Sequence, residues 1–133
     1  MEIFKEFRFD AAHNMPDMPP IPGASGERIG AAHKYTRPHG HSFRARIVLR
    51  GVPDPKSGWV MDFADLEDAL SPLRDQLDHN YLNDIDGLSV PTLENICQWL
   101  WAGLSPAVPG LHRVELYRDS CAEGCVYEGE QHA

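Results

Sequence analysis

Alternation of apolar and polar residues in two segments, 2–13 and 41–50, constrains the fold of this chain more than any other feature. Successive side chains of a β-strand point to opposite faces of a sheet, so a period of two predicts strands that each bury one face. The residues on the apolar parity are Ile3, Phe7, Phe9, Ala11, His13, Phe43, Ala45, Ile47 and Leu49. The sequence therefore predicts two long strands, separated by an irregular, proline-containing loop at 14–38.

Two segments with helical spacing follow these strands. Asp62 is a suitable N-cap for a helix over 63–77, and Thr92 is a suitable N-cap for a second apolar stripe. Two further strands are expected at 113–120 and 123–129. The order of two strands, two helices and two strands predicts an α+β fold, in which an antiparallel ββααββ sheet carries both helices on one face.

Length, charge and cysteine content exclude several classes of protein. The chain has 133 residues, which fits a single domain over 1–133, and its formal net charge is −8. An acidic chain of this kind is not expected to bind nucleic acid, which requires clustered cations. No apolar segment is long enough to span a bilayer, no signal peptide is evident, and three cysteines are too few for a disulfide framework. We therefore expect a cytoplasmic protein that does not bind a membrane.

Three histidines continue the apolar parities of the first two strands. His39 and His41 are two residues apart and so project from one face, and His13 ends the apolar face of the first strand. Three neutral imidazoles suit zinc, and a three-ligand site leaves a position for water or substrate. An H-x-H pair alone is weak evidence, because an inward histidine is more often a hydrogen-bonded core residue. His33 is a possible competing ligand, so the spacing leaves both interpretations open.

Two other polar groups have both a structural and a functional interpretation. Asp78 and His79 follow the first predicted helix, where they are either an ordinary helix end or a carboxylate–imidazole proton relay. Taken alone, these two residues favour the helix end. Basic residues also gather around the paired histidines, and a few of them are candidates to bind an anionic group beside the metal. They are Arg28, Lys34, Arg37, Arg44, Arg46 and Arg50.

Taken together, these motifs resemble the 6-pyruvoyltetrahydropterin synthase family, and within it the bacterial 6-carboxytetrahydropterin synthases of queuosine biosynthesis. The matching segments occur in family order along the whole chain, and only the loop at 14–38 is longer than usual. They are Phe9-Asp10-Ala11-Ala12-His13, His39-Gly40-His41-Ser42-Phe43, Gly58-Trp59-Val60-Met61-Asp62-Phe63, Leu77-Asp78-His79, Tyr81-Leu82-Asn83-Asp84, Pro91-Thr92-Leu93-Glu94-Asn95 and Gly124-Cys125-Val126-Tyr127. So many ordered matches are far more specific than any single motif.

The resemblance implies a T-fold that assembles as a homo-hexamer, whose strands form a barrel. It implies zinc on the three histidines, a relay formed by Asp78 and His79, and a substrate-binding set of Asp119, Thr92 and Arg37. The implied substrate is 7,8-dihydroneopterin triphosphate, whose side-chain hydroxyls would bind zinc so that the attached carbons become acidic. The implied products are 6-carboxytetrahydropterin, acetaldehyde and triphosphate.

Two positions depart from the family pattern. The family's catalytic cysteine lies four residues before the first histidine of the pair, and this chain has Tyr35 there. A phenol has an ordinary pKa of about 10, roughly one to two units above a thiol, so it needs a nearby zinc or cation to act as a base at neutral pH. The family's glutamate that holds the pterin ring is replaced by Asp119, which is one methylene shorter. Cys121 and Cys125 lie nearby and are interpreted as structural.

Three functional hypotheses follow from these departures. The first is an active pterin lyase in which Tyr35, or a loop residue such as Glu27, replaces the thiol. The second is a pterin-binding paralogue without this activity, and the third is a zinc enzyme that acts on a different bicyclic or phosphorylated ligand. We favour the first, because the zinc triad and the pair Asp78-His79 are both intact.

Overall fold

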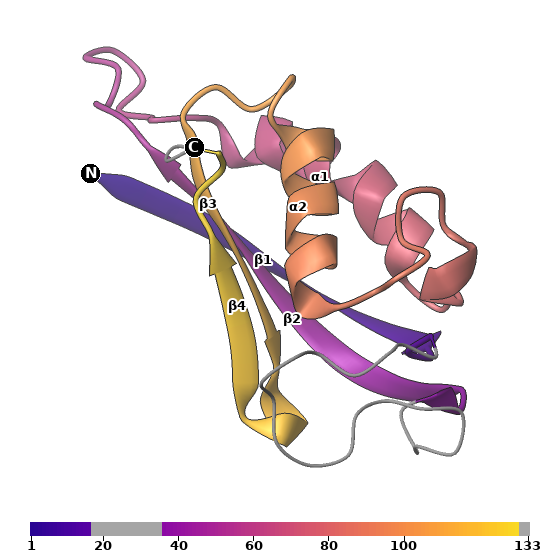
Figure 1. The fold of residues 1–133 in the computed structure, drawn as a ribbon. Coiled ribbons are helices and arrows are strands. Elements are labelled where there is room, and N and C mark those ends of the chain that lie inside the picture. The colour runs from indigo at the N-terminus through magenta and orange to yellow at the C-terminus, as the bar shows by residue number, and fades with distance from the viewer. Residues whose placement is uncertain (17–35, 131–133) are drawn as a thin grey trace.

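A four-stranded antiparallel sheet forms the centre of the fold, with the strands in the order β1-β2-β3-β4 (Figure 1). The computed structural model describes residues 1–16 and 36–130. The elements are β1 (Glu2–His13), β2 (His39–Arg50), α1 (Phe63–Leu77), the 3-10 turn η2 (Leu82–Asp84), α2 (Leu93–Leu104), β3 (Leu111–Arg118), the 3-10 turn η3 (Asp119–Cys121) and β4 (Glu123–Tyr127). Both helices lie on one face of the sheet, which confirms the predicted α+β architecture. Neither described helix is long and apolar enough to cross a membrane.

The register of β1 against β2 places the predicted apolar parities on the same face. The pairing runs without interruption from Glu2 opposite Arg50 to His13 opposite His39. Phe9 lies opposite Phe43, and their rings stack with centroids 4.8 Å apart. Leucines of both helices and one isoleucine of α2 pack against this face. They include Leu66, Leu70, Leu77, Ile96, Leu100 and Leu104.

The last two strands both end two residues earlier than predicted, and β3 also begins two residues earlier. β3 spans 111–118 instead of 113–120, because residues 119–121 form the turn η3 and Ala122 adopts a left-handed conformation with φ of 55°. The turn reverses the chain so that Arg118 pairs with Glu123, and β4 then ends at 127 instead of 129. Alternation alone does not reveal such a turn, because its residues are polar on both parities.

Asp62 caps α1 as predicted, and this contact can be tested. Its side chain accepts a hydrogen bond from the backbone nitrogen of Ala64 at 2.9 Å. We expect Asp62→Ala to lower the free energy of unfolding by about 1 kcal/mol, measured by urea denaturation, because a helix N–H loses its acceptor. Asp65→Ala, which removes another carboxylate of the first turn, is the matched control and should cost only a few tenths of a kcal/mol. Equal losses in the two variants would contradict the capping role.

Candidate metal centre

Three histidines gather where β1 ends and β2 begins. One ring nitrogen of each of His13, His39 and His41 lies within 4.8 Å of the others. The ring centroids are separated by 4.6, 5.0 and 4.9 Å, and the rings meet edge to face. The strand register explains the cluster, since His13 lies opposite His39 and His41 lies two residues further along the same face of β2.

The hydrogen bonds around two of these rings orient their Nε2 atoms toward each other. Nδ1 of His13 lies 3.1 Å from the carbonyl oxygen of Pro91, and Nδ1 of His39 lies 2.8 Å from that of Arg37. A carbonyl only accepts, so both Nδ1 atoms carry the hydrogen and both Nε2 atoms present a lone pair. These Nε2 atoms are 3.1 Å apart, a separation at which two lone pairs repel unless a cation lies between them.

This donor set fits a divalent metal ion. Metal–nitrogen bonds of about 2.0–2.1 Å in a tetrahedral centre place two ligand nitrogens roughly 3.3 Å apart, close to the separation seen here. Nε2 of His41 is buried and has no hydrogen-bond partner among residues 1–16 and 36–130. The carbonyl partners of the other two rings are the kind of outer contact that orients metal-binding histidines. Burial lowers the pKa of His13 to about 4, so its ring is neutral at pH 7 and able to bind a metal.

A cavity of about 270 Å³ opens beside the triad. Thr92 and Glu94 line it from the start of α2, and Arg118, Cys121 and Glu123 line it from the β3–β4 turn. Of the predicted substrate-binding residues, Thr92 is therefore at the cavity, where its hydroxyl also caps α2 by accepting from the backbone nitrogen of Asn95 at 3.1 Å. The cavity is therefore lined both by the candidate metal ligands and by polar side chains from the start of α2 and from the β3–β4 turn.

Arg118 is a functional candidate that the sequence analysis did not identify. Its positive charge helps to lower the pKa values of His13 and His41, although burial is the larger cause for both. Its Nη2 lies 2.6 Å from Glu123, whereas its buried Nε has no hydrogen-bond partner within the described part of the chain. A buried donor without an acceptor costs about 1–3 kcal/mol, so an anionic ligand atom would find a donor here. One signal in the sequence could have identified Arg118. In the strand pattern it has the same parity as the apolar residue Leu116, so it is expected on the inner face of the sheet.

Asp78 and His79 contact each other, and His79 lines a different hollow. A carboxylate oxygen of Asp78 accepts from the backbone nitrogen of Asp10 at 2.9 Å and lies 3.0 Å from Nδ1 of His79. The first of these contacts is the main cause that lowers the pKa of Asp78. His79 adopts a positive φ of 59°, which is uncommon outside glycine, and its side chain is 79% exposed. The volume of this hollow is about 530 Å³. Among the described residues that line it, His41 is the one member of the triad.

Of the other predicted site residues that the structure describes, Asp119 and Arg37 do not line the cavity. Both carboxylate oxygens of Asp119 bind the guanidinium of Arg44 on the other face of the sheet. Arg37 contributes its carbonyl oxygen to His39, and its side chain is not among those that line the cavity. Tyr35 lies outside the described residues, as do the loop residues Glu27 and His33.

Comparisons with known proteins identify relatives along most of the chain. The family model described as 6-pyruvoyl tetrahydropterin synthase matches residues 2–130. The chain is 40% identical over 131 residues to a 6-carboxy-5,6,7,8-tetrahydropterin synthase of Synechocystis sp., covering 94% of this chain and 91% of the relative. It is 38% identical over 86 residues to a dihydroneopterin monophosphate aldolase of Pyrococcus furiosus, covering 65% and 70% of the two chains.

A solved structure shows the same fold. The 6-pyruvoyl tetrahydropterin synthase of Caenorhabditis elegans superimposes with a TM-score of 0.79, covering 98% of this chain and 96% of that one at 24% identity. This likeness confirms the predicted T-fold.

Proposed function

Because the chain belongs to the 6-pyruvoyl tetrahydropterin synthase family, we propose that it is a zinc-dependent lyase acting on a pterin. The proposed reaction converts 7,8-dihydroneopterin triphosphate and one water molecule to 6-carboxytetrahydropterin, acetaldehyde and triphosphate, a step of queuosine biosynthesis. The observation that carries this proposal is the cluster of His13, His39 and His41 beside a cavity of about 270 Å³. The name of the Synechocystis relative supports the product.

The residues around the cavity have distinct roles in this proposal. His13 and His39 are held by the carbonyls that accept from their Nδ1 atoms, so their Nε2 atoms meet the metal without rearrangement. A bound zinc supplies Lewis-acid chemistry, polarising a substrate oxygen so that the neighbouring C–H becomes acidic. The buried Nε of Arg118 donates to a substrate oxygen on the same side, and the hydroxyl of Thr92 lies at the cavity wall.

Asp78 and His79 complete the centre of a neighbouring subunit in our proposal. Within the described residues, His79 lines a separate hollow, and neither residue of the pair lines the cavity of the triad. The sheet order leaves β1 and β4 as edge strands, and each edge can pair with a strand of another copy. Pairing of this kind would close several sheets into a barrel of a homo-hexamer and bring the pair to a second triad.

Tyr35 is the proposed proton acceptor, and a turnover assay tests both the reaction and this role. Zinc-loaded protein is incubated with 7,8-dihydroneopterin triphosphate, and acetaldehyde and pterin products are followed by mass spectrometry. We expect turnover in the wild type and a loss of about a hundredfold in kcat for Tyr35→Phe, with an unchanged zinc content. Tight pterin binding without any turnover would instead indicate the non-catalytic paralogue.

Cys121→Ser is the control for this assay, because Cys121 supplies a thiol that lines the triad cavity. The control should retain kcat within about threefold of the wild type, since a serine preserves the size of the side chain. A loss of activity in Cys121→Ser, with Tyr35→Phe fully active, would transfer the role of proton acceptor to the thiol.

A further inference from the structure

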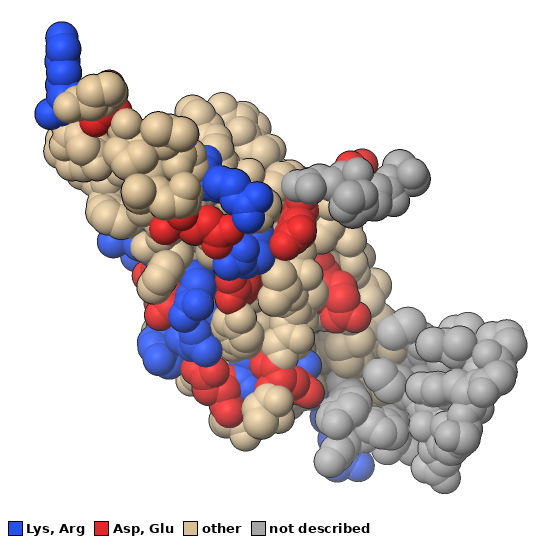
Figure 2. All heavy atoms as spheres, turned by 90° about the vertical axis from the view of Figure 1, so that its left-hand side faces the viewer, with Lys and Arg blue, Asp and Glu red and all other residues tan. Residues whose placement is uncertain are grey.

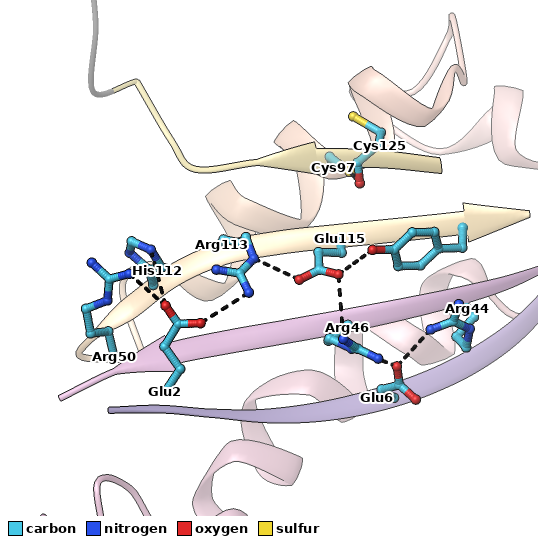
Figure 3. Close-up of polar contacts among 11 residues, drawn as sticks. Glu2, Glu6, Arg44, Arg46, Arg50, Cys97, His112, Arg113, Glu115 and Cys125 are labelled. Atoms are coloured by element: carbon cyan, nitrogen blue, oxygen red, sulfur yellow. Dashed lines mark hydrogen bonds and ion pairs between the residues drawn. The ribbon is translucent and has the colours of Figure 1, made fainter. Parts of the chain in front are cut away.

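The face of the sheet opposite the helices carries interleaved charges, and Arg44 lies among them. Figure 2 looks from the left of Figure 1 and shows basic and acidic side chains alternating across that side. On β2, Arg44 pairs across the sheet with Arg8 of β1 and Tyr117 of β3. Its guanidinium lies over the ring of Tyr117, 4.4 Å from the centroid. It also donates a hydrogen bond to Glu6 at 2.9 Å (Figure 3).

The same guanidinium occupies both oxygens of Asp119. Nε of Arg44 donates to Oδ2 at 3.0 Å, and Nη2 donates to Oδ1 at 3.1 Å. This two-point contact uses the end of the carboxylate, the geometry in which guanidinium and carboxylate fit best. It is the main cause that lowers the pKa of Asp119, so the carboxylate stays ionised. Arg8 adds a second cation at 3.7 Å.

A pterin ring presents the same pattern of donors as a guanidinium. Its 2-amino group and the adjacent ring N–H are parallel donors, and they fit end-on to a carboxylate as Arg44 does. One carboxylate cannot accept both partners in this geometry at once. Asp119 is therefore available to such a ring only after Arg44 has released it.

We propose that Arg44 competes with the ligand for Asp119 and thereby sets the affinity for rings with a guanidine-like edge. This inference rests on the proposed function as a pterin enzyme, together with the role that the family resemblance implies for Asp119, which is to hold the pterin ring. Release of Asp119 does not leave Arg44 unpaired, because Glu6 and the ring of Tyr117 remain in contact with it. Arg44 thus acts through Asp119, as a residue that determines specificity without touching the reacting atoms.

Arg44→Met tests this inference, because methionine keeps an unbranched side chain but removes every donor. Neopterin binding to the zinc-loaded oligomer is measured by isothermal titration calorimetry. We expect the Kd of Arg44→Met to fall about twofold to fivefold below that of the wild type, the range appropriate to an exposed ion pair that no longer has to break. The KM of the proposed reaction should fall with it, while kcat stays within about twofold.

Three controls separate competition from a general change in structure. Arg46→Met is the matched variant, because Arg46 lies on the same face of β2 and binds Glu6 at 2.9 Å (Figure 3). In the described structure, Asp119 forms its ion pairs with Arg44 and Arg8 and none with Arg46. It should leave the Kd unchanged. The analogue of neopterin with a 2-oxo group in place of the 2-amino group should show no gain with Arg44→Met. Asp119→Ala in the Arg44→Met background should remove the gain.

The outcomes distinguish this inference from the function on which it rests. Unchanged or weaker neopterin binding by Arg44→Met would overturn the competition, and if the wild type still turns over its substrate, the proposed function stands. An equal gain with Arg46→Met or with the 2-oxo analogue would also overturn it. If neither the wild type nor Arg44→Met binds any pterin, both the competition and the proposed function fail.

Discussion

Replacing His41 by alanine is expected to remove the metal and abolish turnover. The Nε2 of His41 is buried without a hydrogen-bond partner in the described part of the chain, so metal binding is the role that this nitrogen can fill. His13 and His39 alone offer two ligands, which are fewer than a stable zinc site uses. Loss of one ligand should weaken zinc binding at least about a hundredfold, since even outer contacts to zinc ligands contribute 10–100-fold.

The loss of activity should follow the loss of metal. A Lewis-acid metal supplies several kcal/mol of transition-state stabilisation, so kcat/KM of His41→Ala should fall by roughly a thousandfold. Zinc per chain is measured by plasma mass spectrometry on the same sample that is assayed. Added zinc should raise the unfolding temperature of the wild type and leave that of the variant unchanged, because a ligand stabilises only the state that binds it.

His112→Gln is the matched control for this experiment. His112, on β3, is also a half-buried histidine of the sheet. Its Nε2 lies 3.8 Å from the carboxylate of Glu2 (Figure 3). Glu2 begins β1, whereas His13 of the triad ends it. This variant should retain zinc and activity. Stoichiometric zinc in His41→Ala would show that the metal is held elsewhere and would refute the candidate centre.

Mixing two inactive variants should restore activity, if Asp78 and His79 serve a neighbouring subunit. His79→Ala should lose about a hundredfold to ten-thousandfold in kcat, the range for removal of a proton-transfer group. His41→Ala is inactive for a different reason, the missing metal ligand. In a randomly mixed oligomer, half of the triads belong to His79→Ala chains and are intact. Half of these triads receive their His79 from a His41→Ala chain, in which His79 is intact. Activity should therefore recover to roughly a quarter of the wild type.

Co-expression of the two chains with different tags gives the mixed oligomer, which is purified through both tags in turn. A mixture of His41→Ala and His39→Ala is the control, because both changes affect the triad and no combination of these chains restores it. Recovery in the first mixture and not in the control is the expected result. No recovery in either mixture would show that the pair acts on the triad of its own chain, or not at all.

Local features of the sequence predicted the fold well, because they depend on neighbours along the chain. The period of two over 2–13 and 41–50 places apolar residues on one face of each strand, and pairing those faces brings His13 and His39 together. Asp62 and Thr92 cap helices through side-chain contacts two and three residues away. Such short-range contacts leave a direct trace in the residue pattern.

The partners of Asp119 and Arg118 could not be predicted in this way. Asp119 and Arg44 are 75 residues apart, and only the register of β2 against β3 brings them together. Arg118 faces the triad because the turn η3 begins directly after it, and that turn was interpreted as strand. The position of His79 depends on its backbone contact with Asp10, which lies on a strand distant in sequence.

The uninterrupted pairing of β1 with β2 also makes the metal centre a check on correct folding. A slip of β1 by one residue would turn His13, together with Phe7 and Phe9, to the opposite face from the helices. The slipped chain would then present only the two histidines of β2 to a metal. Metal ions would therefore stabilise the native hairpin selectively, and metal-starved chains would discriminate less strongly against mispaired strands.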